Sequence, residues 1–181
     1  GKRMDKNKLG LIHIYTGNGK GKTTAAMGLI LRASGRGLKV ILGQFLKDRE
    51  TGELTTLKLL PGVQVFRGKS LKKFSFQMND AEKAEVLQRH NVFFKEVTER
   101  CVAEQTDLLV LDEVIGACGT KLLDEGLLLD FLQNKPPHLE VVLTGRNPSP
   151  AMLEAADYVS EICKRKHPFD KGIPAREGIE K

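Results

Sequence analysis

The chain has 181 residues, of which 40% are hydrophobic and 29% charged, and its 29 Lys and Arg exceed its 23 Asp and Glu to give a net charge of +6. This length favours a single domain, and the composition is that of a globular protein rather than of a disordered or fibrous one. No apolar run approaches the ~18 residues that a membrane-spanning helix needs, and no hydrophobic leader follows the basic start, so we expect no membrane association.

The cysteine, basic and aromatic residues of the chain bear on its redox compartment and on its partners. Three cysteines (Cys101, Cys118 and Cys163) lie far apart, and this odd number predicts a reducing cytoplasm rather than a disulfide framework. Much of the basic excess lies in residues 1–8 and 164–181, where it is consistent with solvated tails, or with an anionic ligand or nucleic acid. The chain has no Trp and two Tyr, so platforms for stacking single-stranded nucleic acid are scarce and we expect no nucleic-acid partner.

Short apolar segments alternate with helical ones along the whole chain. Continuous apolar runs predict strands at Leu9–Tyr15, Lys39–Phe45, Val63–Phe66, Leu108–Leu111, Glu140–Thr144 and Tyr158–Ile162. Helical patterns lie between them at Lys22–Ser34, Glu53–Leu60, Asn79–Glu104, Leu122–Asn134 and Pro150–Ala156. Runs that are apolar throughout are typical of strands covered on both faces. The sequence therefore predicts a single α/β domain with a mostly parallel central sheet, helices on both faces, and a ligand site at the carboxyl ends of the strands.

Local signals mark the ends of two of these helices. Gly35 and Gly37 are expected to end the first helix with a left-handed cap. Asn79 followed by Glu82 predicts a capping box at the start of the longest helix. His90 falls on the apolar face of that helix, which favours a packed, hydrogen-bonded core histidine over a ligand.

A glycine-rich loop separates the first predicted strand from the first predicted helix and reads TGNGKGKTT. Glycines allow successive N–H groups to point at one anion, and the positive end of the following helix adds to them. Lys22 can place a charge on phosphate oxygens, and the Thr23 hydroxyl can bind Mg²⁺. In the usual pattern the first glycine stands where this chain has Thr16, so the loop is a variant. The predicted nucleotide-binding residues are Thr16, Gly17, Asn18, Gly19, Lys20, Gly21, Lys22, Thr23 and Thr24.

Two carboxylates follow the fourth predicted strand. Asp112 and Glu113 end the run LLVLDE, and parallel strands bring their carboxyl ends to one edge of the sheet. Strand-end carboxylates are often only solvated caps, but beside the loop they favour a metal site. Thr23, Asp112 and Glu113 are thus predicted to hold the Mg²⁺ of a nucleoside triphosphate. These features identify a P-loop (RecA-like) domain but not its reaction, since kinases, motor ATPases, GTPase switches and nucleotidyl transferases share them.

Five segments together resemble the P-loop type of the ATP:corrinoid adenosyltransferase family. They are YTGNGKGKTTAA, GQFLK, LLVLDE, LTGRN and KHPFDKGIPAREGIE, and they occur in the family's order over nearly the whole chain. The combination is highly specific, because common phosphoryl-transfer enzymes with a P-loop lack the last segment. The resemblance implies a domain at residues 9–163, a basic N-terminal tail at 1–8 and a C-terminal tail at 164–181 that folds near the active site.

The resemblance also implies a particular reaction. Corrinoid cobalt, reduced to Co(I), attacks the 5′ carbon of ATP, so that adenosylcobalamin forms and triphosphate leaves. The loop then holds the leaving group, with Lys22, Thr23 and Glu113 as catalytic residues, Arg146 on phosphate or ribose, and ATP reversed relative to other P-loop enzymes. No general base is required, because Co(I) is already the nucleophile. A homodimer and a flavoprotein or other reductant are further implied partners.

The family associates an aromatic segment with removal of the axial ligand from cobalt. Phe74-Ser75-Phe76 stands at that place, with Phe where many members have Trp, and the two rings are the predicted corrinoid contacts. An alternative is that they anchor a loop to the core. Gln44 and Lys47 follow the second predicted strand, where either could also be a surface polar group. Arg176 stands where the family usually has Gln.

Two other classes of function remain open at the level of sequence. One is a RecA-like ATPase that couples hydrolysis to nucleic acid or a protein partner, which the loop, the carboxylate pair and the charge of +6 also suit. The other is a regulator that binds a nucleotide without catalysis. Product analysis separates all three, because only the adenosyltransferase releases intact triphosphate.

Overall fold

A computed structural model of the protein describes residues 4–46, 51–68 and 73–181. Six strands form one sheet: β1 (Ile12–Thr16), β2 (Val40–Gln44), β3 (Val63–Arg67), β4 (Leu108–Asp112), β5 (Glu140–Thr144) and β6 (Tyr158–Glu161). Their order is β3-β2-β4-β5-β1-β6, and every neighbouring pair is parallel. The predicted α/β class with a parallel sheet is confirmed.

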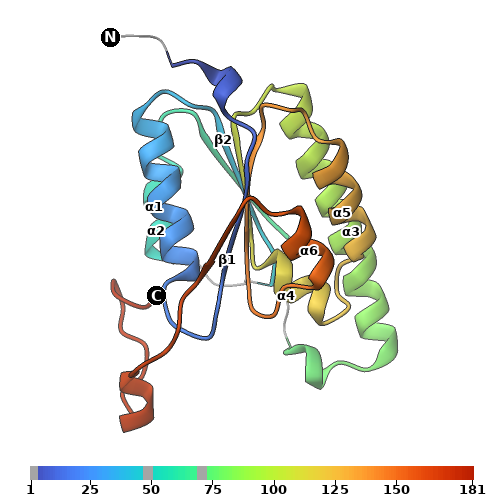
Figure 1. Ribbon diagram of the computed structural model, residues 1–181. Helices are drawn as coiled ribbons and strands as arrows, with labels where there is room; N and C mark the ends of the chain where they lie inside the picture. The colour runs from blue at the N-terminus through green and yellow to red at the C-terminus, as the bar shows by residue number, and fades with distance from the viewer. Residues whose placement is uncertain (1–3, 47–50, 69–72) are drawn as a thin grey trace.

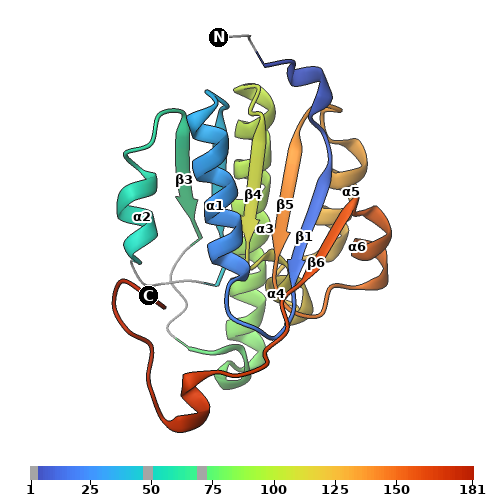
Figure 2. The ribbon, with the colours of Figure 1, turned by 60° about the vertical axis from the view of Figure 1, so that its left-hand side comes forward.

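Helices cover both faces of this sheet, as predicted. They are α1 (Lys22–Gly35), α2 (Gly52–Leu57), α3 (Asp80–Ala103), α4 (Val114–Gly119), α5 (Glu125–Asn134) and α6 (Pro150–Ala155), with short 3-10 turns η1 (Lys6–Lys8), η2 (Ser75–Gln77) and η3 (Pro168–Lys171). Figure 1 shows α1 and α2 on one side of the sheet and α3, α4, α5 and α6 on the other. Figure 2 shows the strands side by side with α1 in front.

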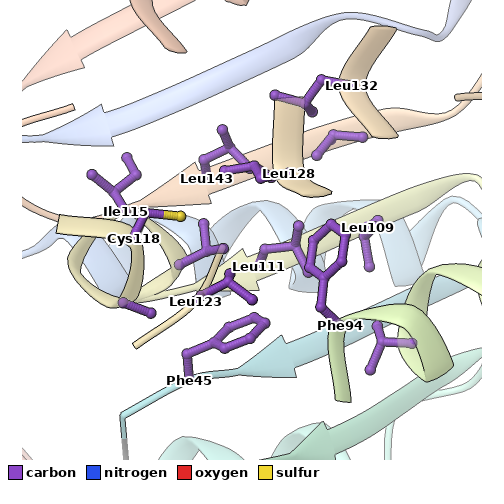
Figure 3. Packing of buried hydrophobic residues seen from close by; sticks show 14 of the residues in the cluster. Phe45, Phe94, Leu109, Leu111, Ile115, Cys118, Leu123, Leu128, Leu132 and Leu143 are labelled. Atoms are coloured by element: carbon purple, nitrogen blue, oxygen red, sulfur yellow. The ribbon is translucent and has the colours of Figure 1, made fainter. Parts of the chain in front are cut away.

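Two apolar clusters, one on each face, form the core. Successive residues of β4 enter different clusters, since Leu109 and Leu111 pack toward α3 and α5 whereas Leu108 and Val110 pack toward α1. Figure 3 shows the larger cluster, in which Phe94 of α3 lies near Leu109. This two-sided burial is the physical reason why the central strands are apolar runs rather than alternating patterns.

The starts of β1 and α5 differ from the predicted ones because side chains there accept hydrogen bonds from backbone N–H groups. β1 begins at Ile12 rather than Leu9, because Glu140 Oε1 accepts the N–H groups of Gly10 and Leu11 at 2.7 Å each. α5 begins at Glu125 rather than Leu122, because the Asp124 side chain caps it by accepting the Gly126 N–H. Helix α4 was not predicted, since its apolar residues continue directly from the β4 run.

The predicted local signals are confirmed. Asn79 and Glu82 form the capping box of α3. Gly37 adopts φ +77° after α1, whereas Gly35 is the last residue of the helix and is not left-handed. His90 is 2% exposed and its Nδ1 lies 2.6 Å from the Leu122 carbonyl oxygen, so it is a core histidine. Burial lowers the pKa of His90, which favours the neutral ring.

Among the described residues, no helix is both long and apolar enough to cross a membrane. The division into tails at 1–8 and 164–181 and a domain at 9–163 stays a prediction, although Lys6 in η1 forms a 2.9 Å ion pair with the buried Asp107 of the domain.

Candidate active site

The glycine-rich loop follows β1 at the carboxyl edge of the sheet and packs against the chain that leaves β6. Gly17 and Gly21 adopt φ +111° and +121°, and the Gly19 N–H donates to the Ile162 carbonyl oxygen at 2.8 Å. Thr16 is the buried last residue of β1, so the turn that needs glycine begins one position later, at Gly17. This register explains why the first glycine of the usual pattern is displaced by one residue.

Gly17→Ala is expected to distort the loop. A methyl group there would lie 2.1 Å from the Ile162 carbonyl oxygen in a backbone conformation that side chains rarely adopt. We expect a loss of about 1–3 kcal/mol in the free energy of unfolding together with weaker ATP binding. Chemical denaturation and ATP titration measure both quantities. Gly28→Ala is the matched control, because a methyl group on this α1 residue meets no atom within 4 Å, and it is expected to be neutral or stabilising. Equal stability and affinity in both variants would contradict this account of the loop.

Lys22 begins α1 and turns back over the loop, where its Nζ donates to the Gly19 carbonyl oxygen at 3.0 Å. Partial burial is the main cause that lowers its pKa, and the nearby positive charge of Arg146 adds to this, whereas Glu113 opposes it. Three charged groups from three elements thus act on one another at this edge. A lysine held by a loop carbonyl is a cation that an incoming anion can capture.

Asp112 at the end of β4 is the centre of a buried hydrogen-bond network. Its Oδ1 accepts the hydroxyl protons of Thr23 at 2.9 Å and Thr144 at 2.7 Å, and its Oδ2 accepts from Gln44 Nε2 at 3.2 Å. The side chains of Gln44 and Asp112 are fully buried. The first turn of α1 is therefore tied to the ends of β2, β4 and β5.

Glu113 follows in the left-handed conformation with φ +61°, and its N–H donates to Thr144 Oγ1 at 2.8 Å. Sequence reasoning missed Thr144 and left open whether Gln44 belongs to the site or is a surface polar group. The signal that could have found them is their position as the last residues of strands adjacent to β4. Lys47 lies outside the described residues.

The residues predicted to hold Mg²⁺ suit that ion. Thr23 and Asp112 place a hydroxyl and a carboxylate oxygen 2.9 Å apart, and Glu113 adds a carboxylate on the adjoining cleft. In the described ranges, no group of three or more His, Cys, Asp or Glu side chains is placed to bind a metal. Mg²⁺ that is shared with a nucleotide typically has one or two protein ligands, with phosphates and waters completing its shell. The oxygen donors at this edge fit such a site.

A cleft of ≈ 1800 Å³ opens at this edge and brings together most of the predicted site. The predicted residues that line it are Asn18, Gly19, Lys20, Gly21, Lys22, Thr23, Thr24, Phe74, Glu113 and Arg146. Thr16 and Gly17 line a smaller adjacent pocket of ≈ 620 Å³, which also includes Arg146. Asp112 is buried beneath the cleft, and Phe76 is outside its lining. The larger cleft exceeds the ~300–1,000 Å³ typical of a site for one small ligand.

Phe74 and Phe76 stand out from the surface beside this cleft. Their side chains are 70% and 81% exposed, and their rings are stacked with centroids 5.5 Å apart. This exposure argues against the alternative that the two rings anchor a loop to the core. Large apolar side chains left in solvent near a cleft are typical of a ligand-binding surface.

The C-terminal tail also reaches the cleft. The Lys164 N–H donates to Asn18 Oδ1 of the glycine-rich loop at 2.9 Å. Beyond it, His167, Phe169 and residues 177–181 line the cleft, whereas Lys166 is exposed and outside the lining. Arg176 pairs with Glu180 within the tail at 2.9 Å.

Comparisons with known proteins identify relatives of this chain. A family model described as ATP:corrinoid adenosyltransferase BtuR/CobO/CobP matches residues 8–180. The corrinoid adenosyltransferase of Pseudomonas aeruginosa is 32% identical over 176 residues, covering 97% of this chain and 85% of the relative. That of Escherichia coli K12 is 33% identical over 179 residues, covering 97% and 87%. The corrinoid adenosyltransferase CobA of Salmonella typhimurium is 33% identical over 174 residues, covering 94% and 85%.

Among solved structures, the cytoplasmic domain of EssC is similar with a TM-score of 0.50 at 14% identity, covering 93% of this chain and 36% of that one. At this identity the likeness concerns the fold alone. The sequence matches are of a different kind, because they run almost from end to end of this chain and over most of each relative. The chain therefore belongs to the ATP:corrinoid adenosyltransferase family.

Proposed function

We propose that the cleft at the carboxyl edge of the sheet transfers the 5′-deoxyadenosyl group of ATP to the Co(I) centre of a corrinoid and releases triphosphate. Family membership supports the reaction, and one structural observation supports the location of the active site in this cleft. The glycine-rich loop, Lys22 and exposed Phe74 line the same cleft, with the Thr23–Asp112 pair at its base. An anion-binding end and an aromatic end therefore adjoin in one site.

The anionic end suits the triphosphate of ATP. The N–H groups of the loop and the amino end of α1 offer partial positive charge, and Lys22 and Arg146 add two full charges. Thr23, Asp112 and Glu113 are the proposed Mg²⁺ ligands, and the ion when bound supplies further positive charge to the phosphate oxygens. Binding ATP requires Lys22 to exchange its contact with the Gly19 carbonyl for a phosphate oxygen.

The chemical step needs charge stabilisation rather than proton transfer. A cobalt–carbon bond forms as the bond between C5′ and the α-phosphate oxygen breaks, and the electron pair of that bond leaves with triphosphate. Negative charge therefore grows on the oxygen that departs. Lys22, Arg146 and the loop N–H groups are fixed donors that oppose this charge, which is how preorganised sites lower such barriers.

The aromatic end suits the corrinoid, which is a large macrocycle with apolar surface. Phe74 and Phe76 can cover the lower face of the ring and exclude water from the axial position, which favours reduction to Co(I). The size of the cleft accommodates a second substrate beside the nucleotide. Arg146 lines both this cleft and the adjacent pocket, so it can reach phosphate from either side.

Phe76→Ala is expected to slow the reaction that starts from Co(II) and a reductant more than the reaction that starts from preformed Co(I). The reason is that the ring is needed to remove the axial ligand before reduction, whereas Co(I) carries none. Stopped-flow spectra of the corrinoid measure both rates. Val92→Ala, at a half-exposed apolar side chain of α3, is the control and is expected to change neither rate. Equal slowing from both starting states would remove Phe76 from this role.

The function itself is tested by incubating the protein with ATP, Mg²⁺ and chemically reduced cobalamin, anaerobically and in the dark. We expect the spectrum of a light-sensitive adenosylated corrinoid, with one triphosphate for each corrinoid converted. Orthophosphate released without corrinoid would instead indicate the RecA-like ATPase, which no comparison favours. Tight ATP binding without either product would indicate a nucleotide-binding regulator.

Family membership also supports further parts of the proposal. We propose that the protein acts as a homodimer, that a flavoprotein or another reductant supplies the electrons for Co(I), and that it works in the cytoplasm. Analytical ultracentrifugation tests the first of these, and turnover with reduced flavodoxin in place of a chemical reductant tests the second.

A further inference from the structure

The C-terminal tail carries large apolar side chains that have no cover. Phe169 is 69% exposed and Ile179 is 61% exposed, and both line the cleft that Phe74 lines. Phe74 itself is 70% exposed. Single exposed apolar residues are common on protein surfaces, but three that converge on one cleft indicate a surface that binds a ligand.

The start of this tail is hydrogen-bonded to the domain, and contacts within the tail hold the turn that carries Phe169. At its start, the Lys164 N–H donates to Asn18 Oδ1, and the Lys164 ammonium forms an ion pair with Asp170 at 3.1 Å. The His167 side chain accepts the Phe169 N–H at 3.1 Å, and this contact caps η3. The turn that carries Phe169 therefore has local hydrogen-bond support while its aromatic side chain faces solvent.

The tail and the segment around η2 both contribute residues to the lining of the cleft, although their backbones lie apart in Figure 1. Figure 1 shows the tail below α1 and the η2 segment on the other side of the sheet, near the start of α3. Figure 2 shows both beyond the carboxyl edge of the strands, the side on which the glycine-rich loop lies. A ligand that fills this cleft would therefore contact apolar side chains from two separate segments of the chain.

We propose that Phe169 and Ile179 form a second apolar wall of the corrinoid site, which contacts the macrocycle from the side away from Phe74. This inference rests on the proposed function and assigns the tail a binding role within it. The loop and its cations already suit the polyanion of ATP, so apolar groups in the remaining part of the cleft require a ligand with extensive apolar surface. Because the tail is bonded to Asn18, the wall is also joined to the loop that receives ATP.

Direct binding of hydroxocobalamin to the full chain, measured by calorimetry with Mg²⁺ and a non-reactive ATP analogue, tests the wall. Phe169→Ala and Ile179→Ala are each expected to weaken binding about tenfold, and the double variant more, since each loses part of the apolar area buried against the ring. Phe169→Leu is expected to restore most of the affinity. The KM for corrinoid is expected to rise in the same order, while the KM for ATP stays unchanged.

Leu59→Ala is the matched control, because Leu59 is 81% exposed but lies outside the cleft. It is expected to bind hydroxocobalamin as tightly as the wild type. If the double variant also binds with wild-type affinity, the wall is refuted although the adenosyltransferase function stands. If the wild-type chain binds hydroxocobalamin but does not adenosylate it, the proposed function fails, and the affinities of the variants still decide the wall.

Discussion

Lys22→Ala is expected to lower kcat/KM for adenosylation by about 100- to 1,000-fold, the usual effect of removing one fixed donor that stabilises developing charge. The wild-type ammonium lies over the loop, 3.0 Å from the Gly19 carbonyl oxygen, and is partly buried near Arg146 and Glu113. Without it, the negative charge that develops on the departing triphosphate is stabilised only by the loop N–H dipoles, Arg146 and the proposed Mg²⁺. Steady-state kinetics with preformed Co(I) measure the effect without interference from the reduction step.

The control for this variant is Lys8→Ala. Lys8 lies in η1, is exposed and precedes β1, so it is at the opposite edge of the sheet from the loop. Its loss removes the same formal charge and is expected to leave kcat/KM within about twofold, because charges beyond a Debye length of ~8–10 Å are largely screened. Full activity in Lys22→Ala would mean that the loop does not hold the leaving group.

Asp112→Asn is expected to lower activity about 10- to 100-fold and to raise the Mg²⁺ concentration needed for half-maximal rate. Its stability, by contrast, is expected to stay within about 1 kcal/mol of wild type. Gln44 Oε1 is buried and has no hydrogen-bond partner within the described part of the chain. A flip of the Gln44 side-chain amide would exchange Nε2 for Oε1 at this contact, so that Gln44 accepts from the amide that the substitution introduces. The side-chain carbonyl at position 112 would still accept from Thr23 and Thr144.

Asp112→Ala separates charge from hydrogen bonding at this position. It leaves the donors of Thr23, Thr144 and Gln44 without their shared acceptor, and we expect a loss of about 3 kcal/mol in the free energy of unfolding. Urea denaturation and Mg²⁺ titration of the rate measure the two variants. Wild-type activity of Asp112→Asn at limiting Mg²⁺ would show that Asp112 does not act through the metal.

The fold was largely predictable because its strands are buried on both faces. The apolar runs that end at Thr144 and near Asp112 correspond closely to β5 and β4, and the capping box at Asn79 places the start of α3. What could not be predicted depends on contacts between distant residues. The start of β1 is set by a carboxylate that lies 130 positions further along the chain, at Glu140, and no local pattern contains that information.

The site was predictable where backbone chemistry restricts the residue type. Closely spaced glycines between a strand and a helix, followed by the Lys22–Thr23 pair, are typical of a phosphate-binding loop, so the loop could be located from sequence alone. Gln44 and Thr144 could not be assigned, because a Gln or Thr at a strand end is ordinary until the sheet order is known. The order places β2 and β5 on either side of β4, and this arrangement brings both side chains to Asp112.

The proposed binding role of the apolar tail residues could not be predicted from the sequence. The resemblance placed the tail near the site, but composition alone could not tell an apolar residue that packs from one that is presented to a ligand. Phe169 and Ile179 became informative only through their exposure and their place in the lining of the cleft. Exposure is a property of tertiary structure, so the sequence alone could not identify the two residues of the proposed second wall.

Phosphorus NMR of the phosphate product tests most directly whether the glycine-rich loop holds a leaving triphosphate rather than a phosphoryl group in transfer. With ATP, Mg²⁺ and reduced cobalamin under anaerobic conditions, we predict resonances of one intact triphosphate for each adenosylated corrinoid and no ADP. ADP and orthophosphate in place of triphosphate would contradict the claim that the loop holds a leaving triphosphate.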